Sequence, residues 1–191
     1  MRKIVAALLV AFILGSTIPS GLAQDYHRQV LEYLAGQLFP DETFTNNGMS
    51  GRERMERAAA KISRWIDWRV RTGFAEWDSI PYYPEDLAAL LNLVDFAADE
   101  TLAMQAAMLV DLILFDIAVD SFYGQCATSH GRATASNVKS AAGDSLVTLQ
   151  ALLWGLGRFQ SNSNMGCVSM AMSRHYTPPP VLEAVALDQP E

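Results

Sequence analysis

The residues of this chain that could do chemistry gather in two polar segments far apart in the sequence. The first, 73–83, reads Gly-Phe-Ala-Glu-Trp-Asp-Ser-Ile-Pro-Tyr-Tyr, and the second, 124–139, contains Ser-His-Gly-Arg at 129–132. Phenols and imidazoles transfer protons, paired carboxylates act as acid and base, and arginine binds a carboxylate bidentately. We therefore predict that the two segments meet at one end of the fold and form a site.

The candidate site residues are chosen by side-chain type. For proton transfer they are Tyr82, Tyr83 and His130, and for ligand binding they are Arg132, Glu76, Trp77, Asp78 and Asn47, with Asn46 as an equivalent amide. Each has a structural alternative. A tyrosine before a proline at a helix start can simply pack against the helix, a tryptophan at a helix junction is often core, and an arginine in a loop can anchor that loop to Asp116 or to a helix C-terminus.

The elements that must position these loops are helices. Apolar residues recur at helical spacing, and no strand-like alternation is evident. We expect helices over about 25–39, 50–72, 84–96, 101–122, 144–159 and 168–176, with a short turn at 181–186. Ser50 and Glu53 form a predicted capping box, and Gly73 is expected to end the second helix. Short links between long apolar helices favour antiparallel neighbours, so the predicted fold is all-α, built from antiparallel helix pairs.

The segment 101–122 is apolar enough to resemble a membrane span. It carries Asp111 and Asp116, however, and ionised carboxylates are costly within a bilayer. We therefore predict a central, buried helix and no stable membrane insertion.

The N-terminus has the pattern of a signal peptide. Arg2-Lys3 precedes an apolar run over 4–14, and Gly21-Leu22-Ala23 places small residues at a cleavage site. We expect cleavage after Ala23, an exported protein that is periplasmic or secreted, a helical domain over 24–187, and a polar end at 188–191. An uncleaved membrane anchor is the alternative.

Charge and cysteine content limit the partners. The net charge of −7 argues against nucleic acid and against an anionic membrane surface, although local arginines can still bind an anionic ligand. No His/Cys cluster has zinc spacing, so neither a metal nor another cofactor is expected. The two cysteines, Cys126 and Cys167, could pair in an oxidising compartment or remain buried thiols.

Four blocks, at 74–83, 86–100, 112–118 and 129–132, resemble in the same order a group of large, exported, uncharacterised bacterial proteins. The likeness spans roughly residues 41–187. Those proteins in turn look like the α/α-toroid proteins, which include alginate lyases, heparinase-like lyases and some glycoside hydrolases. The resemblance implies a small or partial α/α toroid. Because the relatives are longer, it also implies that this chain is the N-terminal part of such a ring.

That resemblance implies a carbohydrate-active protein, either a polysaccharide lyase-like enzyme acting on acidic glycans or a truncated remnant of one. In a lyase, Tyr82 or Tyr83 and His130 would move protons, and Arg132 would hold the uronate carboxylate. Glu76 and Asp78 suggest a glycoside hydrolase instead. A module that binds glycan or protein without catalysis is the competing class, and the oligomeric state stays open.

Overall fold

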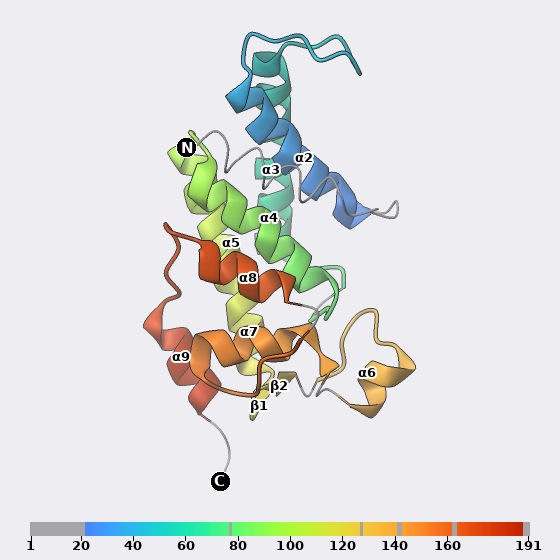
Figure 1. Cartoon of the computed structure of the whole chain (residues 1–191), viewed down its shortest axis with the longest axis vertical. Coiled ribbons are helices and arrows are strands. Elements are labelled where there is room, and N and C mark those ends of the chain that lie inside the picture. Colours follow the sequence, from blue (N-terminus) through green and yellow to red (C-terminus); the bar gives the residue numbers. More distant parts are fainter. Residues whose placement is uncertain (1–21, 77, 127, 141–142, 162–163, 189–191) are drawn as a thin grey trace.

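Helices make up nearly all of the regular secondary structure of the described residues (Figure 1), which confirms the predicted all-α class. The computed structural model describes residues 22–76, 78–126, 128–140, 143–161 and 164–188. Its helices are α2 (Leu22–Leu38), α3 (Gly51–Thr72), α4 (Tyr82–Phe96), α5 (Glu100–Val119), α6 (Ala135–Lys139), α7 (Ser145–Trp154), α8 (Met165–Met172) and α9 (Pro180–Leu187). Most of the predicted signal peptide, and Trp77, lie outside the described residues.

A small hairpin corrects the expectation that the chain has no strands. Strands β1 (Ser121–Phe122) and β2 (Gln125–Cys126) pair antiparallel across a turn. Tyr123 and Gly124 have φ values of 50° and 79° there, as a tight hairpin turn requires. Two-residue strands are too short to show alternation in a sequence, and the turn ends α5 three residues before the predicted boundary.

Local signals determine where the first polar loop starts. At the beginning of α3, Ser50 Oγ accepts from the Glu53 amide at 3.3 Å, and Glu53 Oε2 accepts from the Ser50 amide at 2.8 Å. At its end Gly73 adopts a φ of 71°. The predicted capping box and glycine stop are both confirmed. Helix α4 starts earlier than its proline suggested, at Tyr82, so both tyrosines lie in its first turn.

Consecutive helices run in opposite directions, α2 against α3 and α4 against α5 (Figure 1). A buried pair, His27 Nε2 and Asp86 Oδ1 at 3.1 Å, ties α2 to α4. Helix α8 packs on α4 and α7, and α9 packs on α5.

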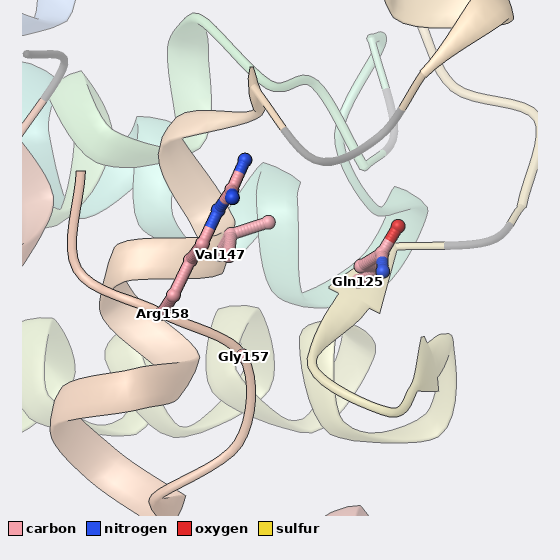
Figure 2. Close-up of a pocket in the computed structure, with 4 residues that line it drawn as sticks. All are labelled: Gln125, Val147, Gly157 and Arg158. Carbon is pink, nitrogen blue, oxygen red and sulfur yellow. The ribbon is translucent and has the colours of Figure 1, made fainter.

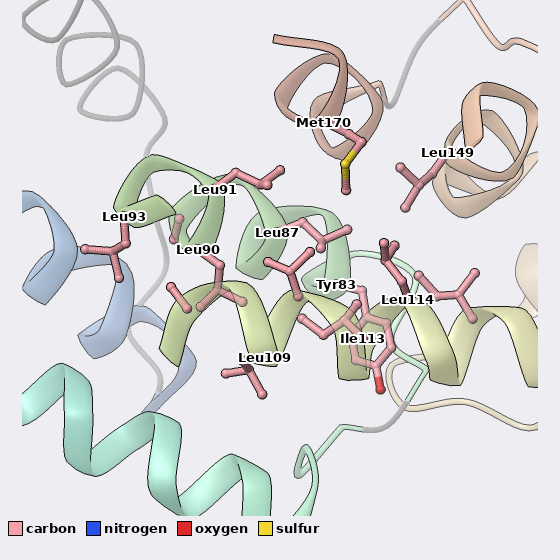
Figure 3. Close-up of a cluster of buried hydrophobic side chains, with 14 of the residues drawn as sticks. Tyr83, Leu87, Leu90, Leu91, Leu93, Leu109, Ile113, Leu114, Leu149 and Met170 are labelled. Atoms are coloured by element: carbon pink, nitrogen blue, oxygen red, sulfur yellow. The ribbon is translucent and has the colours of Figure 1, made fainter. Parts of the chain in front are cut away.

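Helix α5 is the central helix that the sequence predicted. Leu109, Ile113 and Leu114 are fully buried on it and meet the leucines of α4 (Figure 3). Among the described residues, α5 is the one helix that is long and apolar enough to cross a membrane. Its buried side belongs to the core, which accounts for part of that apolarity, whereas its other side is exposed, so the prediction of a buried helix holds for one side of α5.

Candidate functional site

The two polar loops meet, as predicted. A Cβ built on Gly131 would lie only 2.8 Å from Cβ of Glu76 and 2.9 Å from its Cα. A position so close to another backbone accepts only glycine without movement. The glycine of the second loop therefore permits the close approach of the first.

Arg132 joins the second loop to the first loop and to the start of α4. Its Nη2 donates a hydrogen bond to the Tyr82 hydroxyl, and its guanidinium carbon lies 5.1 Å from the centre of the Tyr82 ring. Its Nε lies 3.5 Å from Oε2 of Glu76. The side chains of Arg132 and Glu76 are 57% and 41% exposed, so water screens their attraction and this ion pair contributes little stability.

The backbone at Arg132 is held in an uncommon conformation, with a φ of 60°. Left-handed backbone is unfavourable for a residue with a long side chain and persists where surrounding contacts enforce it. The contacts with Tyr82 and Glu76 provide that enforcement. They present the guanidinium at the surface rather than at Asp116, the partner that the structural alternative suggested.

A shallow pocket of about 350 Å³ opens beside this arginine. Its walls come from the start of α4, the second loop, and the starts of α7 and α8. The lining residues are Ile80, Pro81, Pro84, Glu85, Arg132, Thr134, Gly143, Ser145 and Met165. Arg132 and Glu85 are the charged residues of that lining, and burial raises the pKa of Glu85. The pocket therefore offers one cation, one acid and mostly apolar walls.

A second, smaller pocket of about 270 Å³ lies between β2 and the loop that follows α7 (Figure 2). Gln125, Val147, Gly157 and Arg158 line it. None of these four lining residues is a predicted site residue, and Arg158 is the one charged residue among them. We assign it no chemistry.

Tyr83 does not reach the pocket, which corrects its assignment as a proton-transfer residue. The side chain is 1% exposed and packs edge-on against Phe74, with ring centres 5.2 Å apart. Its hydroxyl donates to Asp116 Oδ2 at 3.1 Å. Burial is the main cause that raises the pKa of this phenol far above its ordinary value. The structural alternative, a ring packed beneath the helix start, is the correct one.

Glu76 and Asp78 do not form a carboxylate pair. Glu76 points to Arg132, whereas Asp78 is 6% exposed and lies near Asp120 at the end of α5. Burial, followed by the charge of Asp120, raises the pKa of Asp78 to about 7. The carboxyl group of Asp78 is therefore partly protonated near neutral pH, because burial beside a like charge disfavours its ionised form.

One ring nitrogen of His130 is hydrogen bonded to the backbone, and the other is buried. Nδ1 lies 3.0 Å from the carbonyl oxygen of Thr128, and because a carbonyl only accepts, Nδ1 carries the proton. Nε2 is buried without a hydrogen-bond partner among the described residues. Its ring interacts electrostatically with Asp144, whose Oδ1 caps α7 and whose Oδ2 is likewise buried and unbonded within that part of the chain. Burial raises the pKa of Asp144 to about 6.

Asn46 and Asn47 lie away from the site, which corrects their inclusion. They belong to the loop before α3, whereas the first polar loop follows α3 (Figure 1). The 22 residues of α3 separate the two loops by roughly 33 Å at 1.5 Å per residue. Asn46 Oδ1 accepts from Arg54 Nη1 at 2.8 Å, and Asn47 Oδ1 accepts from the Met49 amide, so both shape their own loop.

Cys126 and Cys167 are free and buried. The disulfide is thus not formed, and the alternative of two buried thiols describes the structure. Burial raises the pKa of both thiols, which makes them unreactive. Trp77, the proposed stacking platform, falls outside the described residues.

Three acidic residues at the site were missed or undervalued: Asp116, Asp120 and Asp144. Asp116 and Asp120 are four residues apart at the end of α5, a spacing that places both on one helix face. That signal was present in the sequence. Asp144 was visible only as a residue at a helix start, and its nearness to His130 follows from the tertiary fold.

Within the part of the chain that the structure describes, no three potential metal ligands converge. The chain matches no protein-family model, and no curated protein or solved structure is similar to it. What the site can do is therefore judged from its geometry.

Proposed function

We propose that this protein is an exported helical module that binds acidic glycans, with a uronate carboxylate held by Arg132 in the pocket beside α4. The position of Arg132 carries the proposal. Its guanidinium lines the 350 Å³ pocket while Tyr82 and Glu76 hold it from the side. Those contacts engage Nε and Nη2, and a guanidinium has further donors for a carboxylate.

Binding is favoured over catalysis because the proton-transfer residues are not assembled around the pocket. Tyr83 is in the core, and Nε2 of His130 is buried. Of the three candidates, Tyr82 is the one that contacts a pocket residue, Arg132. An enzyme needs both a base and an acid near the scissile bond, whereas a binding module needs only shape and charge.

The test is binding of purified protein to alginate, heparin and polygalacturonate, with neutral dextran as the reference polymer. We expect Arg132→Ala to weaken binding to the acidic polymers at least about tenfold, as loss of a charge-assisted contact does. The matched control is Arg52→Ala, since Arg52 is equally exposed and pairs with Asp41 at 3.2 Å at the far end of α3. Equal loss in both variants would mean that binding reflects net charge alone and would overturn the proposal.

A polysaccharide lyase-like enzyme is the second candidate, favoured by the hydrogen bond from Arg132 to the Tyr82 hydroxyl. In that case Tyr82 would remove the proton beside the carboxylate that Arg132 holds. Incubation with the same polymers would then release unsaturated products that absorb in the ultraviolet. Tyr82→Phe would keep glycan binding and abolish this release. Reducing ends without the absorbance would indicate hydrolysis instead.

We further propose that the helix pairs form a partial α/α toroid with the pocket on its rim. The antiparallel pairs α2/α3 and α4/α5, and the two loops gathered at one end of α3 and α5, support this arrangement. A structure of a longer homologous chain, in which such pairs complete a ring around the same pocket, would support it. Export would be tested by N-terminal sequencing of the protein from a periplasmic fraction, where the first residue should be Gln24.

A further inference from the structure

Helix α5 exposes an apolar stripe on the side that its neighbours leave uncovered, and the stripe continues into β1. It consists of Met104, Met108, Leu112, Phe115, Val119 and Phe122, which are between 39% and 61% exposed. Helices α3, α4 and α9 pack on other sides of α5. Isolated apolar side chains are normal on a surface, but a contiguous stripe of this kind marks an interface.

The two carboxylates in the body of α5 are held by other elements beside the stripe. Asp111 accepts from the Tyr176 hydroxyl at 2.6 Å, and Asp116 accepts from the Tyr83 hydroxyl at 3.1 Å. Glu100 lies one turn before Met104, beyond the end of the stripe. The six side chains of the stripe are thus all uncharged, although the chain has a net charge of −7.

We propose that this stripe is the interface of a symmetric dimer, in which α5 of one copy packs against α5 of a second copy. Its residues recur at intervals of three or four, the spacing with which one helix packs along another. In an antiparallel pair Leu112, near the middle of the stripe, would face its own counterpart. Phe115 would then lie against Met108 of the other copy, and methionine adapts to such irregular neighbours.

The area agrees with a dimer. Six side chains exposed to this extent present roughly 600 Å² together, most of the about 800 Å² that each partner contributes to a stable interface. A lipid surface fits less well, because the stripe covers one side of a helix whose opposite side is fully packed into the protein core. A two-fold pair buries the stripe completely and sets one uncharged surface against another.

The test measures the mass of the full chain by sedimentation equilibrium between about 1 and 100 μM, a range that brackets moderate dimer affinities. We expect a monomer–dimer equilibrium for the unmodified protein. Phe115→Glu places a charge in the centre of the interface and should raise the dissociation constant at least about 100-fold. Val168→Glu is the matched control, because Val168 is 50% exposed on α8, and it should leave the equilibrium unchanged.

A second variant keeps the proposal testable if Phe115→Glu does not fold, which circular dichroism would reveal. Leu112→Cys should give a disulfide-linked dimer under mild oxidation, because the native thiols are buried. Thr101→Cys should not, since antiparallel pairing would hold its two copies roughly 30 Å apart.

Three results would overturn the proposal. One is a monomer throughout the concentration range, whether or not the protein then binds neutral phosphatidylcholine vesicles or another protein. Another is a dimer that Phe115→Glu leaves intact. The third is cross-linking through Thr101→Cys rather than Leu112→Cys.

Discussion

In two pairs of residues that are close in the sequence, Glu76 with Asp78 and Tyr82 with Tyr83, one side chain lies at the surface and the other is buried. Glu76 and Tyr82 lie at the surface around Arg132, whereas Asp78 and Tyr83 are buried, 6% and 1% exposed, around the end of α5. The two environments contain the same functional groups, a carboxylate and a phenol. The surface set is built around a cation, whereas the buried set places the Asp78 carboxyl group near other carboxylates, which raise its pKa.

The backbone explains how neighbours diverge. Asp78 has a φ of 51°, a left-handed conformation that aspartate tolerates better than most residues. Tyr82 and Tyr83 are adjacent in the first turn of α4, where successive side chains point about 100° apart. Tyr82 therefore contacts Arg132, whereas Tyr83 contacts Asp116 of α5. The surface set can bind ligands, and the buried set holds the loop to the core.

Truncating the two tyrosines should separate these roles most strongly. Tyr83→Ala removes a fully buried ring and its hydrogen bond, and we expect a loss of about 3–5 kcal/mol in the free energy of unfolding. Tyr82→Ala removes a half-buried ring and should cost about 1 kcal/mol or less. Urea unfolding measures both. Similar losses would show that the two rings are not in different environments.

The raised pKa of Asp78 predicts an unusual pH dependence of stability. The pKa of Asp78 rises from 3.8 to about 7 on folding, so between these values the folded protein holds a proton that the unfolded chain releases. Stability from this group is complete below pH 3.8 and is lost as the pH rises through 7. Asp78→Asn should flatten the decrease between about pH 5 and 8, which we expect to be a few kcal/mol.

Urea unfolding of both proteins at about pH 5 and about pH 8 measures this loss of stability. Asparagine suits the comparison because it accepts the left-handed backbone and resembles the protonated acid. Glu76→Gln is the control and should leave the pH dependence as it is. An unchanged pH dependence in Asp78→Asn would refute the raised pKa of Asp78.

Contact between the loops can be broken at Gly131. A methyl group in Gly131→Ala would lie 2.8 Å from Glu76 Cβ, so the loops must separate, at a cost of about 1–2 kcal/mol. Gly143→Ala has open space around the new methyl group and should be neutral. Thermal unfolding of both variants checks this, and equal melting temperatures would mean that the loops do not touch.

The smallest effect is expected at the exposed ion pair. Glu76→Gln removes its charge next to Arg132 and should change the free energy of unfolding by less than about 0.5 kcal/mol. Affinity for acidic glycans should rise slightly, because Arg132 loses a competing anion. Parallel urea and binding measurements check both effects, and a stability loss above about 1 kcal/mol would contradict a solvent-screened pair.

Local chemistry made much of the fold predictable. The capping box at Ser50, the stop at Gly73 and the apolar periodicity of α3 and α5 act over a few residues, so they can be read directly from the chain. The meeting of the two loops also followed, because antiparallel helices with short links return the chain to the same end. The inclusion of Asn47 failed for the same reason, since that loop lies at the opposite end of α3.

The helical class, the order of the helices and the pair of loops that holds the polar residues depend on neighbours along the chain, so the amino-acid sequence was enough to specify them. Which member of each neighbouring pair is buried, the raised pKa of Asp78, and the burial of the two thiols as free cysteines emerged only from the folded chain. These outcomes depend on contacts between residues distant in the sequence, and on burial, which no local pattern of residues specifies.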